Sequence, residues 1–428
     1  MSKKSDGKIG LWSIVSIGIG GMVGGGIFAV LGLAVQLAHG GTEIAFLIAG
    51  IVALLTTYSY SKLAVHIPSQ GGTVKFLDKA FGVDLFTGGI NSLLWISYVV
   101  MLSLYSYAFG SYGATFFGSQ SGWIKHIIIS LGIILPMILN MLSADIIGKA
   151  ETYIVGIKVA ILLFFVAVGI FGVQTSNLAP AAWTPPLHLV AGGMIIFLAY
   201  EGFELIANTA EDARDYKKTL PRAFFISVGF VIILYILVAI VSVGSLPVHK
   251  IVEAKDYALA AAARPFLGNA GFIMISIAAV LSTFSAINAT LYGSARLSFT
   301  IAKEGELPAF LEDKVWNKPI EGLLITSGLT LLLANLADLS SISMMGSAGF
   351  LIIFGTVNAA NVKLSKQTES HSWISITGII ACALALVALI WQTATTQPTH
   401  LWVLAGMLAL SFGIELLYRQ YRKHEISL

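Results

Sequence analysis

The sequence predicts an all-α integral membrane protein with twelve membrane-spanning helices. Of its 428 residues, 57% are hydrophobic and only 11% are charged, whereas soluble domains carry about 25% charged residues. The charged residues gather in clusters, and the apolar runs between them reach the roughly 20 residues that a helix needs to cross the hydrocarbon. Runs of this length also exclude the alternating pattern of a barrel strand.

The first apolar run follows a short polar segment, residues 1–8. It is too long for a signal peptide and no small-residue cleavage site ends it, so we expect it to be retained as the first span. Residues 1–428 then form a single membrane domain in the lipid bilayer. The expected spans are roughly 11–36, 43–65, 86–117, 124–144, 148–173, 189–209, 222–246, 271–301, 321–337, 341–362, 374–393 and 399–419.

The positive charges predict the orientation of these spans. If the N-terminus is cytoplasmic, twenty of the 25 lysines and arginines lie on the cytoplasmic side, and Lys158 lies within a span. An excess of positive charge marks cytoplasmic loops. We therefore expect both termini, and a charged loop at 303–318, to be cytoplasmic. A short outer helix is expected within 247–265. The four lysines and arginines expected on the outer side of the membrane are Lys125, Lys250, Lys255 and Arg264.

Composition excludes several classes of function. The single cysteine, Cys382, allows no disulfide framework, and no Cys/His spacing indicates a metal site or cofactor. The formal net charge of +3 gives no case for nucleic-acid binding. No His-Glu-x-x-His motif or pair of intramembrane aspartates is present, so we do not expect an enzyme.

The first span contains a glycine-rich segment, GIGGMVGGGIF at 18–28. Each glycine inside a helix costs about 1 kcal/mol relative to alanine, so this segment is the least helical part of the span. It predicts either an unwound backbone that lines a binding cavity or close packing against another helix.

The sixth span contains FLAYEGFE at 197–204, with Glu201 and Glu204 on either side of Gly202. Carboxyl groups at the bilayer centre normally face a cavity or a partner, although both could instead be protonated and structural. This span would open a second set of five helices, as the first span opens the first set. Interrupted helices in matching positions indicate a transporter site between inverted repeats.

Lys158 lies about 12 Å along the fifth span at 1.5 Å per residue. It could extend to the headgroups, or it could be held among carbonyls and hydroxyls of neighbouring helices. Burial disfavours the charged ammonium, so a lysine held in this way can gain and lose a proton near neutral pH. That would couple proton movement to a conformational change.

Four motifs carry a resemblance to a known family. The sequence resembles the amino acid–polyamine–organocation (APC) transporters over essentially the whole chain, and it is most similar to proton-coupled permeases with a lysine in helix five, where Lys158 falls. The matching segments are the first-helix glycines 20–28, the sixth-helix segment 197–204, the loop from Glu211 to Ala223 and the segment 302–308. In the loop, Asp215 and Tyr216 replace the usual Asn-Pro.

The resemblance implies the LeuT-type fold, a 5+5 inverted repeat with helices 1 and 6 discontinuous. The first repeat would cover about 9–175 and the second about 187–365. Helices 11 and 12, at about 372–420, would be peripheral.

The resemblance also implies the site residues. A substrate carboxylate would meet the N–H groups of Gly24, Gly25 and Gly26. The amino group would meet the carbonyls of Met22, Leu198 and Glu201, beside Gly202. Glu204 would serve in gating or proton transfer. Lys158 would face the carbonyls of Gly18 or Ile19 and the hydroxyls of Ser282, Thr283 or Ser285. Candidates for the side-chain pocket are Tyr98, Met101 and Asn288.

These features together predict a symporter of the cell membrane that moves L-amino acids with protons by alternating access. An amino acid or polyamine exchanger without proton coupling is the alternative, and a receptor that binds amino acids without moving them is a remote one. Glu201 stands where close relatives often have an apolar residue, and it leaves the charge of the substrate open. The oligomeric state is also open, because a monomer suffices for transport.

Overall fold

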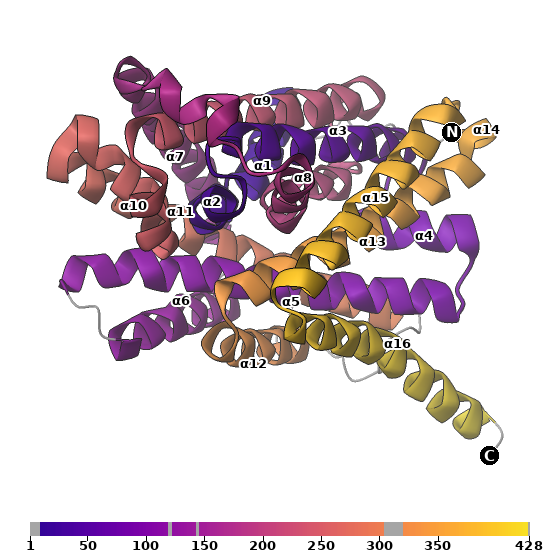
Figure 1. The fold of residues 1–428 in the computed structure, drawn as a ribbon. Helices are drawn as coiled ribbons and strands as arrows, with labels where there is room; N and C mark the ends of the chain where they lie inside the picture. The colour runs from indigo at the N-terminus through magenta and orange to yellow at the C-terminus, as the bar shows by residue number, and fades with distance from the viewer. Residues whose placement is uncertain (1–8, 119–121, 143–144, 304–319, 427–428) are drawn as a thin grey trace.

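The computed structural model describes residues 9–118, 122–142, 145–303 and 320–426 (Figure 1). Within these residues helices are joined by turns and short irregular segments, and two isolated β-bridges pair Ile9 with Ala213 and His39 with Trp183. From residue 304 onward, the expected cytoplasmic loop lies outside the described residues.

Most of the predicted spans are continuous helices. In the described part of the chain, nine helices are long and apolar enough to cross a membrane. They are α3 (Thr42–His66), α5 (Leu85–Ala114), α6 (Gly122–Leu142), α7 (Asp145–Gly169), α9 (Tyr216–Ser245), α11 (Ala258–Lys303), α13 (Leu339–Lys363), α15 (Ser372–Thr396) and α16 (Thr399–Ile426).

Two further spans are broken. The helices α1 (Leu11–Met22) and α2 (Gly26–Ala38) meet at an angle of 44°. The helix α8 (Pro186–Ile195) continues at 50° into the 3-10 segments η5 (Phe197–Tyr200) and η6 (Phe203–Thr209). Counting each broken pair as one span gives eleven. The predicted ninth span corresponds to α12 (Ile320–Leu336), whose 17 residues are near the lower limit for crossing a bilayer.

Short elements connect the spans. They are α4 (Gly72–Phe81), η1 (Thr115–Phe117), η2 (Ile170–Gly172), η3 (Thr175–Leu178), η4 (Pro180–Ala182), α10 (Val248–Glu253), η7 (Lys255–Tyr257) and α14 (Ser365–Thr368). A break at Gly268, where φ is 62°, divides α11.

The expected outer helix within 247–265 is therefore several pieces. Its alanine-rich part, Ala258–Ala263, is the buried start of α11 and does not lie on a surface. Alanine side chains allow this close packing, because they are small.

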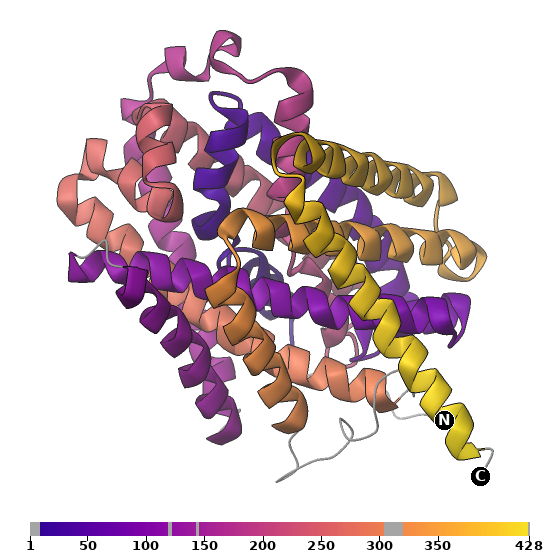
Figure 2. The ribbon, with the colours of Figure 1, turned by 60° about the horizontal axis from the view of Figure 1, so that its bottom comes forward.

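The helix α5 forms the centre of the bundle. Every residue from Thr87 to Ser106 is buried, and α5 packs against α6, α11, α12, α13 and α16. Figures 1 and 2 show α5 running through the protein, with α6 and α12 on one side and α1, α2 and α8 on the other. The broken spans are thus enclosed by continuous helices.

The peripheral helices α6, α15 and α16 present apolar side chains outward. Leu131 on α6 is 44% exposed, Leu384 on α15 is 65% exposed and Trp402 on α16 is 81% exposed. Water-soluble proteins rarely expose so much contiguous apolar surface, whereas hydrocarbon chains solvate it. The exterior is that of a multi-pass membrane protein.

The connecting elements separate to two ends of the bundle. In Figure 1, α4 and α14 lie at the right end, and α10 lies at the left end. The expected topology places the connections containing α4 and α14 on one side of the membrane and the connection containing α10 on the other. In the structure α4 and α14 lie at one end of the bundle and α10 at the other, as the expected topology requires.

Candidate functional site

The two broken spans lie side by side and run in opposite directions. The backbone just before α1 pairs with the backbone after η6, because the Ile9 N–H donates to the Asp212 carbonyl at 3.1 Å. The end of α2 pairs with the η4 region through the bridge of His39 and Trp183. Within the spans, α1 packs against η6 and α2 against α8. The two breaks therefore come together near the middle.

Glycines allow the breaks to touch. A methyl group on Gly202 would lie 2.5 Å from the carbonyl carbon of Gly21, and one on Gly26 would lie 2.8 Å from the Cα of Ala199. Gly202 also has φ of 114°, in the left-handed region that favours glycine. The glycines at the breaks thus pack the two broken spans together, and the backbone between α1 and α2 is unwound. That this backbone lines a binding cavity stays a prediction.

The first break supplies unused N–H groups at the start of α2. The first turn of a helix has no acceptors within the helix, so the N–H groups of Gly26 and Phe28 have no partner in α2. The Ile27 N–H donates to the Tyr235 hydroxyl. Gly25 is the N-cap residue. The Gly24 N–H instead donates to the Gly21 carbonyl at 3.0 Å. Gly24 is one of the three residues expected to donate to the substrate carboxylate. Its N–H could do so only after breaking the hydrogen bond to Gly21.

The second break is tied to α13 by a serine. The Ser347 hydroxyl accepts from the Leu198 N–H at 3.0 Å and donates to the Ile195 carbonyl at 2.8 Å. The Glu201 N–H donates to the Leu198 carbonyl at 3.2 Å. The Leu198 carbonyl, which is expected to meet the substrate amino group, therefore already has one partner and can accept a second.

Tyrosine hydroxyls contact carbonyls at both breaks. The Tyr235 hydroxyl on α9 lies 2.7 Å from the Met22 carbonyl oxygen and 3.2 Å from the Ala199 carbonyl oxygen. The Tyr105 hydroxyl on α5 donates to the Gly21 carbonyl at 3.4 Å. The sequence analysis named neither tyrosine. The available signal was that a buried tyrosine hydroxyl usually has a hydrogen-bond partner.

Lys158 is buried beside the first break. Its side chain is 2% exposed, and the Nζ donates to the Gly20 carbonyl at 2.9 Å. The carbonyls expected as partners, those of Gly18 and Ile19, belong to the two preceding residues. A cavity of about 10 Å³ between α7 and α11 touches Lys158, and its other lining residues are apolar. The ammonium is therefore shielded from water, and the Gly20 carbonyl is one of its partners.

Two of the hydroxyls expected around Lys158, those of Ser282 and Thr283, bind backbone carbonyls. The Ser282 hydroxyl lies 2.8 Å from the Val23 carbonyl oxygen and 2.5 Å from the Gly24 carbonyl oxygen. Thr283 donates to the Ala279 carbonyl of its own helix, and Ser285 is buried on the same helix. Ser282 thus holds the unwound segment itself, three residues beyond the carbonyl that Lys158 contacts.

Two buried carboxyl groups lie at the second break. Glu204 accepts from the Gly202 N–H at 2.8 Å and from the Tyr98 hydroxyl at 3.2 Å. The Glu201 carboxyl lies beside Glu204 and the Tyr105 hydroxyl. Glu201 is 3% exposed and Glu204 is 2% exposed. Two carboxyl groups therefore lie side by side at the second break, where two negative charges would repel each other strongly.

The two broken spans close the expected substrate site completely. Met22, Gly24, Gly25, Gly26, Leu198, Glu201 and Gly202 are all buried. Among the pocket candidates, Met101 is buried, and Asn288 accepts a hydrogen bond from Asn140 at 2.8 Å. Within the described residues, no group of three or more His, Cys, Asp or Glu side chains could hold a metal ion. A ligand could reach this region only if surrounding helices move.

Comparison with known proteins decides the family. The family model described as amino acid permease matches residues 9–412. The chain belongs to the amino acid permease family. Members are transporters of the APC superfamily, not enzymes, so this permease transports amino acids across a membrane.

Three relatives illustrate the similarity. The permease is 36% identical to an uncharacterized protein of Methanocaldococcus jannaschii, over 98% of this chain and 97% of the relative. It is 33% identical to the inner membrane transport protein YbaT of Escherichia coli, over 96% of each chain. It is 25% identical to the branched-chain amino acid permease BcaP of Bacillus subtilis, over 84% of this chain and 81% of the relative.

Proposed function

We propose that this permease is a proton-coupled symporter that takes up L-amino acids across the cell membrane by alternating access. The observation that carries the proposal is the buried ammonium of Lys158 at the Gly20 carbonyl. Protonation of this amine changes the charge next to an unwound segment. The balance between conformations of α1 and α2 would change with it.

The substrate would bind where the two breaks meet. The free N–H groups at the start of α2 suit a carboxylate, because a helix N-terminus carries partial positive charge. The carbonyls of Met22 and Leu198 suit an ammonium group, and each can accept a second hydrogen bond. An amino acid carries both charges, so it matches this arrangement.

The antiparallel broken spans also support the LeuT-type arrangement that we propose. The first repeat would contain α1 to α7 and the second α8 to α13, with α15 and α16 peripheral. Alternating access would then be movement of the broken spans against α5 and its neighbours. With both termini in the cytoplasm, α4 and α14 face the cytoplasm and α10 faces outward.

The test is uptake of radiolabelled L-alanine, L-leucine, L-lysine and L-glutamate into proteoliposomes, with and without an inward proton gradient. We expect the gradient to drive accumulation by the wild type, and Lys158→Ala to abolish that dependence. Lys62→Ala is the matched control, because Lys62 is only partly buried and its ammonium donates to the Glu369 carbonyl, which belongs to neither break. It should behave as the wild type.

The same assay tests the alternative of exchange. Uptake that requires amino acid inside the vesicle and ignores the proton gradient would contradict symport. Lys158 would then have a structural role, and Lys158→Ala would lower the amount of folded protein without changing the pH dependence of uptake.

A further inference from the structure

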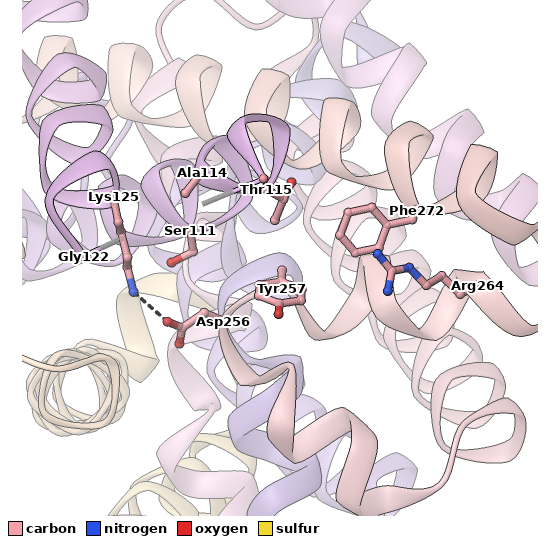
Figure 3. A pocket seen from close by; sticks show the side chains of 10 residues that line it. Ser111, Ala114, Thr115, Gly122, Lys125, Asp256, Tyr257, Arg264 and Phe272 are labelled. Atoms are coloured by element: carbon pink, nitrogen blue, oxygen red, sulfur yellow. Dashed lines mark hydrogen bonds and ion pairs between the residues drawn. The ribbon is translucent and has the colours of Figure 1, made fainter. Parts of the chain in front are cut away.

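A second site is indicated by a cavity of about 500 Å³ at the α10 end of the bundle. It lies between the end of α5, the start of α6 and the segment from η7 to α11 (Figure 3). Small-molecule sites commonly have volumes of about 300–1,000 Å³. The residues that line this cavity include none of those at the two breaks. The lining residues that concern ligand binding are Thr115, Lys125, Asp256, Tyr257, Arg264 and Phe272.

One wall of the cavity is an ion pair. The Lys125 Nζ lies 2.6 Å from the Asp256 Oδ2. The Tyr107 hydroxyl donates to the same oxygen at 3.4 Å, and the Lys125 ammonium lies 3.7 Å from the centre of the Tyr107 ring. Lys125 and Asp256 are therefore fixed in place, and their charges balance.

Arg264 adds a positive charge to the cavity, and no carboxylate among the described residues pairs with it. Its guanidinium carbon lies 4.0 Å from the centre of the Phe272 ring. Stacking on an aromatic face holds the guanidinium plane but leaves its N–H edge free. In Figure 3 this guanidinium and the Lys125–Asp256 pair lie on either side of Tyr257.

We propose that this cavity is an outer binding site for a zwitterionic amino acid, with its carboxylate on Arg264 and its ammonium toward Asp256. The planar guanidinium edge suits a carboxylate, which it can bind through two parallel hydrogen bonds. Asp256 Oδ2 binds Lys125, so Oδ1 is available to a second cation. The proposal rests on the proposed function, because the ligand is the substrate before it reaches the breaks.

The position of the cavity fits an entry site. The segment η7, which carries Asp256, packs against α2. The Lys255 backbone lies so close to Gly32 of α2 that no Cβ would fit there. The segment that would hold the ligand through Asp256 therefore contacts α2 directly. The N-terminus of α2 would hold the substrate at the inner site. With the N-terminus in the cytoplasm, this is the external face.

A single reactive thiol can test the site directly. The one natural cysteine, Cys382, is 2% exposed, so Thr115→Cys adds the only accessible thiol in the described residues. We would measure its labelling by a charged methanethiosulfonate reagent in nanodiscs. The probes are millimolar L-alanine, L-leucine, L-lysine and L-glutamate, and chloride alone, in a buffer that contains no other carboxylate. At least one amino acid should slow the labelling.

Substitutions then identify the group that binds. Adding Arg264→Gln should raise the half-protecting concentration roughly tenfold or more, as expected for loss of a charged hydrogen bond. Arg264→Lys should restore part of the protection. Lys250→Gln is the control, because Lys250 is an exposed cation of α10 that does not line the cavity. Equal protection in Arg264→Gln, or protection by chloride alone, would overturn the proposal.

A blocked inner site separates this proposal from the transport proposal. In Gly25→Val the new side chain would meet the Tyr105 ring and block the inner site. This variant is compared only after thermal unfolding shows that it is folded, because the contact is close. Protection that persists there supports a separate outer site, and protection that disappears overturns it. If the wild type takes up amino acids but no amino acid slows the labelling of the Thr115→Cys thiol, only the outer site is refuted. If amino acids slow the labelling but are not taken up, only the transport proposal is refuted.

Uptake kinetics give a second measurement that does not depend on the engineered thiol. Arg264→Gln should raise the KM of uptake several-fold and leave the maximal rate unchanged, whereas Lys250→Gln should change neither. An unchanged KM in Arg264→Gln would overturn the proposal, whatever the reactivity of the cysteine.

Discussion

The hydroxyl group of Tyr235 lies 2.7 Å from the carbonyl oxygen of Met22 and 3.2 Å from that of Ala199. One side chain of α9 therefore joins the two broken spans at their breaks. A hydroxyl has a single proton, so it cannot donate fully to both carbonyls at once. If a substrate ammonium took the Met22 carbonyl, the Tyr235 proton would remain available to Ala199.

We expect Tyr235→Phe to impair uptake while the protein still folds. The substitution keeps the ring, which packs against Phe46 and Tyr200, and removes only the hydroxyl. The loss of one hydrogen bond should lower the free energy of unfolding by about 1 kcal/mol. Uptake should fall several-fold, because the breaks lose their shared partner. Initial uptake rates and thermal unfolding of the purified protein measure the two effects.

Tyr200→Phe is the matched control for Tyr235→Phe. Tyr200 belongs to η5, and its hydroxyl is equally buried, but it donates to the Phe46 carbonyl of α3 at 2.8 Å and not to a carbonyl of either broken span. Stability should fall by a similar amount, and uptake per folded molecule should stay close to that of the wild type. Equal uptake in the two variants would contradict a special role for Tyr235.

Gly202→Ala should destabilise the permease strongly. The residue has φ of 114°, and its new methyl group would lie 2.5 Å from the Gly21 carbonyl carbon. Backbone strain of this kind costs roughly 1–3 kcal/mol, and overpacking costs a similar amount. Gly229→Ala is the control, because nothing lies within 4 Å of the added methyl in α9. That change should be neutral or stabilising by up to about 1 kcal/mol. Thermal unfolding in one detergent compares them.

The position of the first break could be predicted from the sequence because its cause is local. Glycine is a poor helix former wherever it stands, and the break at 23–25 falls inside the glycine-rich segment 18–28. The eleven spans and broken pairs that meet the length and apolarity criteria follow equally from composition. Span length and hydropathy need no knowledge of neighbours.

The partners at the breaks could not be predicted, because they depend on how the helices rotate against each other. Tyr235 lies on α9 and Ser282 on α11, and each is more than 200 residues along the chain from the carbonyl that it contacts in the first broken span. Lys158 was expected at Gly18 or Ile19, and the structure places it at Gly20. That register is set by packing between α7 and α1, and one sequence contains no information on it at this precision.

Glu201→Gln should change the pH dependence of uptake. Glu201 lies beside Glu204, at the break of the second broken span. Glutamine keeps the size of the side chain but removes a carboxyl group that could carry a proton, so the midpoint of the pH–uptake profile should move. Glu43→Gln, a half-buried acid at the start of α3, should leave the midpoint unchanged. An identical profile in Glu201→Gln would show that the pair does not take part in proton transfer.

A buried polar cluster fixes the peripheral helix α15 to the bundle. Asn358 on α13 accepts from the Ser59 hydroxyl at 2.7 Å and donates to the Thr56 hydroxyl at 3.0 Å. Ser59 also lies 2.9 Å from the Ser375 hydroxyl of α15. Away from water, these groups have few other partners, so the cluster should be costly to interrupt.

Asn358→Ala should therefore lower the free energy of unfolding by about 1–3 kcal/mol, because Ser59 and Thr56 each lose a buried partner. Thr377→Ala is the control, since that exposed hydroxyl donates only to the Trp373 carbonyl in its own helix; its effect should stay within about 0.5 kcal/mol. Thermal unfolding measures both. Uptake per folded molecule should be unchanged in either variant, because the cluster joins α3, α13 and α15 and contacts neither break. A loss of uptake at unchanged stability would instead place Asn358 in the transport mechanism.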